Sequence, residues 1–316
     1  MSRPLASLSL DLDNKWSYMK THGDEGWESF PSYLDLVVPR VLEMLAKRNL
    51  RITFFIVGQD AERPENTAAL RSIAEAGHEI GNHSFHHEPW LHLYSRAQLA
   101  EELGRTEAAI EHATGAKTRG FRGPGFSFSE DVLDELLERG YAYDASTFPT
   151  FLGPLARLYY FFTARLDKEQ REERKQLFGS MAEGLRRLKP YKWRLRQGEL
   201  LEIPVTTMPI FRAPIHASYV LYLAGYSKTL AKFYFWLGMT MCRLRGVEPS
   251  ILLHPLDFLG KDDDQGLDFF PAMQSPRADK LGIMEWVLDA LASRFEVLTM
   301  EEHAAAWKDC RVKRQP

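Results

Sequence analysis

The chain has 316 residues, of which 45% are hydrophobic, and its formal net charge is −3. This length allows one large α/β domain or two smaller ones, and the composition excludes a disordered or fibrous chain. The slightly negative charge gives no general attraction to nucleic acid, so we expect no nucleic-acid partner. The two cysteines, Cys242 and Cys310, lack the spacing of a zinc site, and we expect a reducing compartment with no disulfide framework.

Strands and helices are predicted to alternate along most of the chain. The first apolar run is short and ends at Asp11, which is typical of a first strand and not of a secretory signal. The predicted strands are residues 5–12, 51–58, 79–82, 141–144, 200–205, 250–253 and 295–298. The predicted helices are residues 35–48, 66–75, 95–114, 129–139 and 278–294. For the helix over 95–114 we expect Ser95 as N-cap, with Gln98 completing a capping box.

Residues 150–249 depart from this alternation. An aromatic run, a mixed-charge helix, a basic stretch without acids and a second aromatic segment lie at residues 159–162, 167–175, 186–196 and 233–236. We interpret the region as an insertion that shapes the substrate site within a single domain of residues 1–316. Its aromatic and basic side chains would suit an anionic membrane surface, and a buried aromatic core with a solvated basic helix would give the same composition. The most apolar part, residues 219–242, contains Lys228 and Lys232 and is not predicted to span a bilayer.

Side chains that can bind a metal lie where predicted strands end. Asp11 and Asp13 are two residues apart and project to the same side, so one can bind a metal while the other acts as general base. A solvated turn would show the same spacing. His83 and His87 are four residues apart, which can place both imidazoles on one face of a helical turn. A histidine-rich loop without metal is the alternative, and His86 is out of phase with the pair.

Three further polar residues lie at or after predicted strands. Arg122 lies in a loop of glycines and proline over residues 121–126, where its guanidinium can pair with a carboxylate and keep it ionised. His254 follows a strand and can donate a proton to a leaving group. Asp144 ends a strand and can orient His254. Taken singly, each is also an ordinary polar residue of a turn or strand end.

In order and context, five segments between residue 8 and about residue 298 resemble the motifs of the polysaccharide deacetylase superfamily, carbohydrate esterase family 4. They are Ser9-Leu10-Asp11-Leu12-Asp13, His83-Ser84-Phe85-His86-His87, Arg122-Gly123-Pro124-Gly125, Tyr143-Asp144-Ala145-Ser146 and Leu252-Leu253-His254-Pro255. The resemblance implies an α/β fold, a distorted (β/α)7-type barrel with the region 150–249 inserted. Two departures are the separation of the aspartates by Leu12 and the lack of a tryptophan downstream of the fourth motif. The separated form resembles a branch with intracellular peptidoglycan-deacetylase-like enzymes, allantoinase-like amidases and aminoarabinose-lipid deformylases.

The resemblance also implies a role for each site residue. One divalent metal would be held by three side chains: Asp13, His83 and His87. The metal is usually Zn²⁺, and this ligand set also accepts Co²⁺, Ni²⁺ or Mn²⁺. Asp11 would be the general base, paired with Arg122. His254 would be the general acid, tuned by Asp144.

The expected function is metal-dependent removal of an acetyl or formyl group from the nitrogen of an amino sugar, in a glycan or a lipid-linked precursor. An amidase for a small non-sugar amide and a glycan-binding module without turnover are the alternatives. Aromatic rings lining the pocket would favour a sugar, and the candidates are Trp16, Trp27, Trp90 and Tyr94. We expect a cytoplasmic location, peripheral at the inner membrane face for a lipid-linked substrate, and leave open a homo-oligomer.

Overall fold

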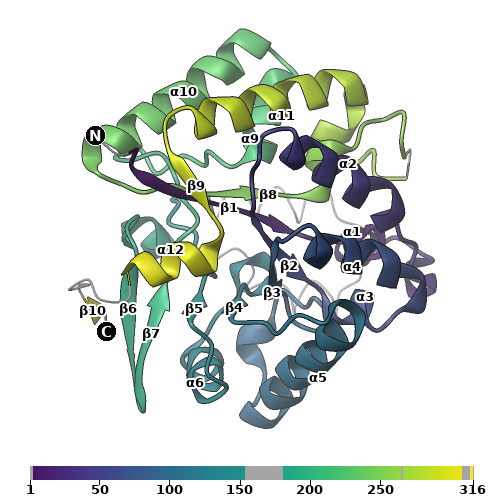
Figure 1. Cartoon of the computed structure of the whole chain (residues 1–316), viewed down its shortest axis with the longest axis vertical. Helices are drawn as coiled ribbons and strands as arrows, with labels where there is room; N and C mark the ends of the chain where they lie inside the picture. Colours follow the sequence, from purple (N-terminus) through teal and green to yellow (C-terminus); the bar gives the residue numbers. More distant parts are fainter. Residues whose placement is uncertain (1–2, 154–180, 265, 308–313, 316) are drawn as a thin grey trace.

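The strands build one largely parallel sheet. The computed structural model describes residues 3–153, 181–264, 266–307 and 314–315. Within these ranges the strands are β1 (Leu5–Asp11), β2 (Thr53–Ile56), β3 (Glu79–Asn82), β4 (Gly120–Phe121), β5 (Tyr143–Asp144), β6 (Tyr191–Leu195), β7 (Gly198–Glu202), β8 (Ser250–Leu253), β9 (Glu296–Leu298) and β10 (Arg314–Gln315). Their order is β10-β6-β7-β5-β4-β3-β2-β1-β8, with β9 also paired to β1 (Figure 1). Every strand pair is parallel except β6–β7.

Two hydrogen bonds link the segment that follows β7 to the start of β8. The amide of Thr206 donates to the carbonyl of Ser250 at 2.9 Å, and the amide of Ser250 donates to Thr206 Oγ1 at 2.8 Å. These bonds join the two ends of the series β8-β1-β2-β3-β4-β5-β7. The predicted distorted (β/α)7-type barrel is therefore confirmed, with β6 and β10 extending the sheet beyond it.

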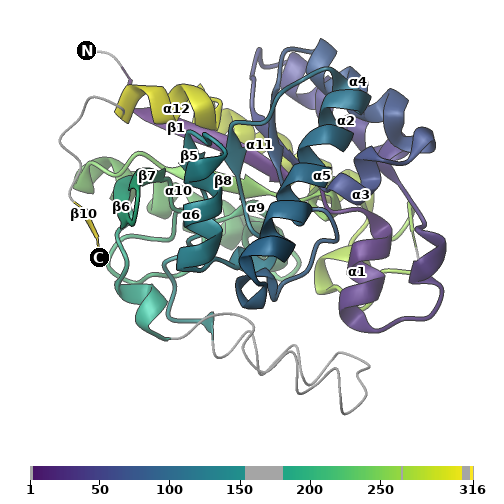
Figure 2. The same cartoon turned by 90° about the horizontal axis from the view of Figure 1, so that it is seen from below.

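Helices cover the barrel on the outside. They are α1 (Lys15–His22), α2 (Leu34–Ala46), α3 (Gly58–Ala61), α4 (Thr67–Glu75), α5 (Arg96–Thr114), α6 (Glu130–Glu138), α9 (Ala217–Ala224), α10 (Lys228–Arg245), α11 (Arg277–Ala292) and α12 (Met300–Trp307). In two views, α9, α10 and α11 lie together near β8 (Figures 1 and 2), and Figure 1 shows α3, α4 and α5 beside β2 and β3. The five predicted helices, at 35–48, 66–75, 95–114, 129–139 and 278–294, correspond to α2, α4, α5, α6 and α11, whereas α1, α3, α9, α10 and α12 were not predicted. The capping box at Ser95 and Gln98 is present.

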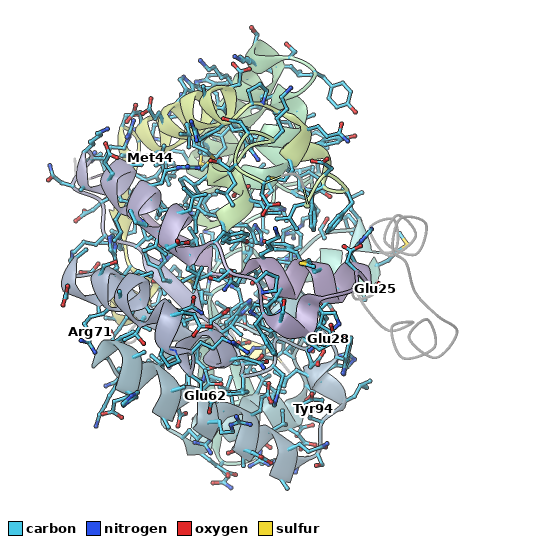
Figure 3. All side chains as sticks on the ribbon, turned by 90° about the vertical axis from the view of Figure 1, so that its right-hand side faces the viewer. Glu25, Glu28, Met44, Glu62, Arg71 and Tyr94 are labelled. Carbon is cyan, nitrogen blue, oxygen red and sulfur yellow. The ribbon has the colours of Figure 1, made fainter. Side chains whose placement is uncertain are left out.

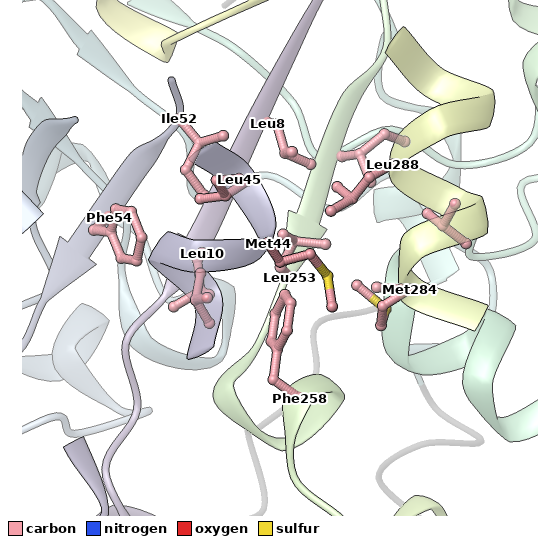
Figure 4. Packing of buried hydrophobic residues seen from close by; sticks show 14 of the residues in the cluster. Leu8, Leu10, Met44, Leu45, Ile52, Phe54, Leu253, Phe258, Met284 and Leu288 are labelled. Carbon is pink, nitrogen blue, oxygen red and sulfur yellow. The ribbon is translucent and has the colours of Figure 1, made fainter. Parts of the chain in front are cut away.

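The main core lies between the sheet and helices α2 and α11. Its fully buried side chains meet in the layer seen in Figure 4: Leu8, Leu10, Leu45, Phe54, Leu253 and Leu288. Burying each such side chain contributes roughly 1.5–3 kcal/mol. Charged side chains are exposed at the surface, as Figure 3 shows for Glu25 and Glu28 near the 3-10 turn Trp27–Ser29, for Glu62 at the end of α3 and for Arg71 on α4. This pattern makes the barrel a rigid frame for the loops at its carboxyl edge.

The interpretation of residues 150–249 as an insertion needs correction. β7 lies in this region and pairs in parallel with β5, so it is a strand of the barrel itself. Part of the basic stretch 186–196 forms β6, a strand and not a solvated helix. The predicted aromatic run at 159–162 and the mixed-charge helix at 167–175 lie outside the described residues. Among the described helices, none combines the length and the apolar character that crossing a membrane requires.

Candidate metal centre

All the predicted site residues lie along the carboxyl edge of the barrel. Each ends a strand or follows it by one to a few residues: Asp11 and Asp13 at β1, His83 and His87 at β3, Arg122 at β4, Asp144 at β5 and His254 at β8. Parallel strands direct their carboxyl ends to one edge, so residues far apart in sequence come together there. The structure places them in four groups, three of two or more side chains around Asp13, Asp11 and His254, and a fourth around Asp144.

Asp13, His83 and His87 form the first group. One ligand atom from each lies within 4.8 Å of the others. Nε2 of His87 lies 2.9 Å from Asp13 Oδ1, and Nε2 of His83 lies 3.3 Å from the same oxygen. Burial opposes ionisation of Asp13, but attraction to His87 and His83 outweighs it and holds the pKa of this carboxyl well below its ordinary value.

The donor atoms of this group fit a divalent cation. Nδ1 of His83 lies 2.6 Å from the carbonyl oxygen of Arg122, which can only accept, so Nδ1 carries a hydrogen. In neutral His83, Nε2 then directs a lone pair toward the Asp13 carboxylate, and these two electron-rich atoms repel each other. A cation bound between them removes this repulsion. Asp13 Oδ1 is buried and has no hydrogen bond of normal geometry among the described residues. Two imidazole nitrogens and a carboxylate oxygen are a typical three-ligand set for zinc.

The two histidines converge through a loop, not through the helical turn that their spacing suggested. No helix or strand is assigned to residues 83–87, and Ser84 and His87 have φ angles of 61° and 55°. Non-glycine residues rarely adopt such angles, so surrounding contacts must hold the loop.

Glu102 of α5 holds this loop in place. Its Oε1 accepts the amides of Phe85 and His86 at 2.9 and 2.7 Å, and its Oε2 lies 2.8 Å from Nδ1 of His86. Burial alone would raise the pKa of Glu102. The hydrogen bonds and the attraction of His86 have the larger effect, so the pKa of Glu102 lies below its ordinary value. We did not predict Glu102 from the sequence. An acid between Leu99 and Leu103 on the buried face of a helix was the available signal.

Asp11 and Arg122 form the second group, a buried ion pair. Nη1 of Arg122 lies 2.6 Å from Asp11 Oδ1, and both side chains are buried. The guanidinium also donates to Ser9 Oγ at 2.8 Å and to the carbonyl of Ala145 at 3.0 Å, and it stacks 4.5 Å from the ring centroid of Phe55. Arg122 therefore fixes the orientation of the Asp11 carboxylate beside the metal ligands.

His254 belongs to the third group, and its partner differs from the predicted one. Nδ1 of His254 lies 3.1 Å from Ser218 Oγ, and Ser218 donates to Asp257 Oδ1 at 2.7 Å. The backbone amide of His254 donates to Asp257 Oδ2 at 2.8 Å. Among the described residues, Asp144 makes no hydrogen bond to His254. The prediction that Asp144 orients His254 is corrected on this point.

Asp144 instead pairs with Glu202 of β7. Both carboxyl groups are fully buried, and burial raises the pKa of each, most strongly that of Glu202. Asp144 Oδ1 accepts from Ser146 Oγ at 2.6 Å, whereas Oδ2 lacks a donor among the described residues. A proton held by Glu202 satisfies that oxygen, since two buried carboxyls side by side do not both ionise. Ser146 in turn accepts the amide of Gly123 at 2.8 Å, so the acid pair supports the Arg122 loop.

The aromatic candidates differ in how accessible they are. Trp16 is fully buried and its indole nitrogen donates to Asp60 at 2.9 Å, which excludes it as a stacking surface for a sugar. Trp27, Trp90 and Tyr94 are half-buried.

Comparisons with known proteins agree with this architecture. Residues 24–143 match the model of the polysaccharide deacetylase family. The chain is 35% identical over 104 residues to peptidoglycan-N-acetylmuramic acid deacetylase PdaA of Bacillus subtilis, a match covering 33% of this chain and 38% of that protein. It is 27% identical over 149 residues to a peptidoglycan deacetylase of Helicobacter pylori, covering 45% and 49% respectively. The chain thus spans less than half the length of these relatives.

The fold has a counterpart along the whole chain. A solved polysaccharide deacetylase-like structure from Mycobacterium smegmatis superposes with a TM-score of 0.60 at 19% identity, covering 100% of this chain and 98% of that chain. Residues 24–143 therefore carry the similarity to the polysaccharide deacetylase family, and the barrel fold and the order of the motifs along its carboxyl edge agree with that similarity.

Proposed function

We propose that the protein is a metal-dependent hydrolase that removes an N-acyl group from an amino sugar. The observation that carries this proposal is the convergence of Asp13, His83 and His87 on one unpartnered carboxylate oxygen, beside the buried Asp11–Arg122 pair. The names of the relatives, which are peptidoglycan deacetylases, support an N-acetyl amino sugar as the substrate class. Acetyl is therefore favoured over formyl.

The chain's own residues supply the proton transfers of this reaction. When bound, a divalent ion polarises the amide carbonyl and acidifies the attacking water. Asp11 accepts the proton of that water, and Arg122 holds the carboxylate in position. His254 donates a proton to the departing nitrogen, because an amide anion is too poor a leaving group. The products are a free amine on the sugar and a carboxylic acid.

Incubation with substrates tests the proposal. The purified protein, loaded with Zn²⁺ or Co²⁺, is incubated with free and lipid-linked N-acetyl and N-formyl amino sugars, and acid release and mass loss are followed. Asp11→Asn should abolish turnover while keeping the bound metal, and His83→Ala should lose both. Turnover of small non-sugar amides alone would support the amidase alternative. Metal binding without any turnover would support the glycan-binding alternative.

We further propose that the substrate is presented at an anionic membrane surface. Helix α10 exposes apolar side chains along one side: Leu230, Phe233, Trp236 and Leu244. The helix carries four basic residues and no acid, so its surface complements anionic lipid head groups. The exposed Tyr222 and the site residue Ser218 both lie on α9, so this surface continues toward His254.

Vesicle sedimentation tests the membrane proposal. The protein should pellet with vesicles that contain an anionic lipid and stay in solution with zwitterionic ones. The double variant Phe233→Ser, Trp236→Ser should lose this binding, whereas Leu93→Ser, which alters an exposed leucine elsewhere, should keep it. No binding to anionic vesicles would refute the proposal. Concentration-dependent dimers that the double variant abolishes would instead identify a second copy of the chain as the occupant.

A further inference from the structure

The side chain of His254 is held by two residues that no sequence motif identified. Ser218 comes from α9, and Asp257 lies in the 3-10 turn η7 (Pro255–Phe258) directly after His254. Asp257 is buried and Ser218 is half-buried. We refer to the chain of bonds from Asp257 Oδ1 through Ser218 Oγ to His254 Nδ1 as the Ser218–Asp257 relay.

The hydrogens of the relay can be assigned from its donors and acceptors. Ser218 has one hydroxyl hydrogen, and it donates this to Asp257 Oδ1 at 2.7 Å. Ser218 Oγ can therefore only accept from Nδ1 of His254, 3.1 Å away. Nδ1 carries a hydrogen in both protonation states, and Nε2 is the nitrogen that gains and loses the exchangeable proton. Asp257 Oδ2 accepts the backbone amide of His254 at 2.8 Å, so the carboxylate fixes backbone and side chain together.

We propose that Ser218 and Asp257 are the positioning residues that direct Nε2 of His254 toward the leaving nitrogen, in place of Asp144. This inference rests on the proposed function. In the step concerned, the C–N bond of the tetrahedral intermediate breaks and its electron pair goes to nitrogen, which takes the Nε2 proton. The carbonyl re-forms in the acid product, and neutral His254 keeps its Nδ1 hydrogen on Ser218. Burial raises the pKa of the Asp257 carboxyl, and the attraction of His254 together with the bonds from the His254 amide and from Ser218 opposes this rise.

Other titratable groups face the relay from the elements packed against it. His216, just before α9, has its ring centroid 5.9 Å from that of His254. From α11, Lys280 donates to the carbonyl of Leu256 at 2.5 Å and attracts Asp257, while burial lowers the pKa of Lys280 to about 8. The Asp257 charge also reaches the hydroxyl groups of Tyr18 and Tyr33. Because Asp257→Asn also removes a charge that acts on Lys280, Tyr18 and Tyr33, Ser218→Ala is needed as a second variant that leaves every charge in place.

The test combines kinetics with an observation of His254 itself. The pH profiles of kcat and KM are measured for the metal-loaded enzyme on an N-acetyl amino sugar, and His254 is titrated by NMR in protein with ¹⁵N-labelled histidine, assigned with His254→Gln. Ser218→Ala should lower kcat about 10- to 100-fold with little change in KM. Asp257→Asn should move the alkaline limb of the kcat profile and the NMR midpoint of His254 down by about one pH unit. Ser218→Thr, which keeps the hydroxyl, should restore most of kcat.

Asp144→Asn is the matched control, because it alters the acid that the family resemblance assigns to His254. It should leave the NMR midpoint of His254 unchanged. A shifted midpoint in Asp144→Asn with none in Asp257→Asn, or a wild-type kcat in Ser218→Ala, overturns the proposal. If the wild type shows no turnover but its His254 titration responds as expected, the proposed function fails and the relay stands. If Asp257→Asn does not fold, judged by circular dichroism, the Ser218 pair decides between the outcomes.

Discussion

Replacing Arg122 by methionine should destabilise the fold more than any exposed substitution. The side chain is fully buried and bonds to Asp11, Ser9 and Ala145. Methionine fills part of the same space but donates no hydrogen bond and carries no charge. The variant therefore leaves the Asp11 carboxylate buried without its cation.

The size of the loss follows from the bonds that are removed. Breaking a buried ion pair on one side costs about 3–5 kcal/mol, because an uncompensated charge remains in the interior. The lost bonds to Ser9 and Ala145 leave a hydroxyl and a carbonyl unpartnered, each at about 1–3 kcal/mol where no water reaches. Retained packing of methionine against Phe55 offsets part of this. We expect a loss of at least about 4 kcal/mol in the free energy of unfolding.

Urea denaturation at neutral pH, followed by circular dichroism, measures this loss. The double variant Asp11→Asn, Arg122→Met removes both charges and should recover at least about 2 kcal/mol of the single-variant loss. A loss below about 1 kcal/mol for Arg122→Met, or no recovery in the double variant, would refute the reasoning. It would show that Arg122 does not compensate a buried negative charge on Asp11.

Three further predictions concern the metal ligands and the pH dependence of stability. Glu102→Gln should weaken Zn²⁺ binding about 10- to 100-fold in calorimetry by loosening the loop of His83 and His87, whereas the exposed neighbour Glu101→Gln should leave it unchanged. Zn²⁺ at one hundred times its Kd should stabilise the protein by about 2.7 kcal/mol in thermal melts; Asp13→Ala should abolish this shift, and a persisting shift would place the metal elsewhere. Burial lowers the pKa of His216 to about 3, so the unfolded chain binds the extra proton below its ordinary value of 6.5. Stability should thus fall as the pH drops from about 6.5 toward 3, by up to about 4 kcal/mol for this group, and His216→Phe should show a shallower decline.

Most of the strands, five of the ten described helices and the edge that carries the site could be predicted from the sequence, because those features follow from local patterns. The short strand β10, the strand β6 and the helices α9 and α10 were not predicted. The apolar run before Asp11 and the capping box at Ser95 need no distant residue to be recognised. The shared carboxyl edge of parallel strands predicted that the aspartates of β1 and the histidines after β3 lie on one side of the barrel, whereas the choice of Asp13 as the ligand came from the family resemblance. What the local pattern did not contain was the conformation of residues 83–87, which Glu102 fixes from another helix.

Partners of buried polar groups were decided only by the tertiary structure. Asp144 ends its strand as predicted, but its carboxyl group pairs with Glu202 of the neighbouring β7 and not with His254. Ser218 reaches His254 from α9, within a region that the sequence suggested to be an insertion. The residues near a side chain in the sequence determine which edge of the sheet it lies on. Its hydrogen-bond partner depends on which strand or helix packs beside it in the folded barrel, and that neighbour is far away in the sequence.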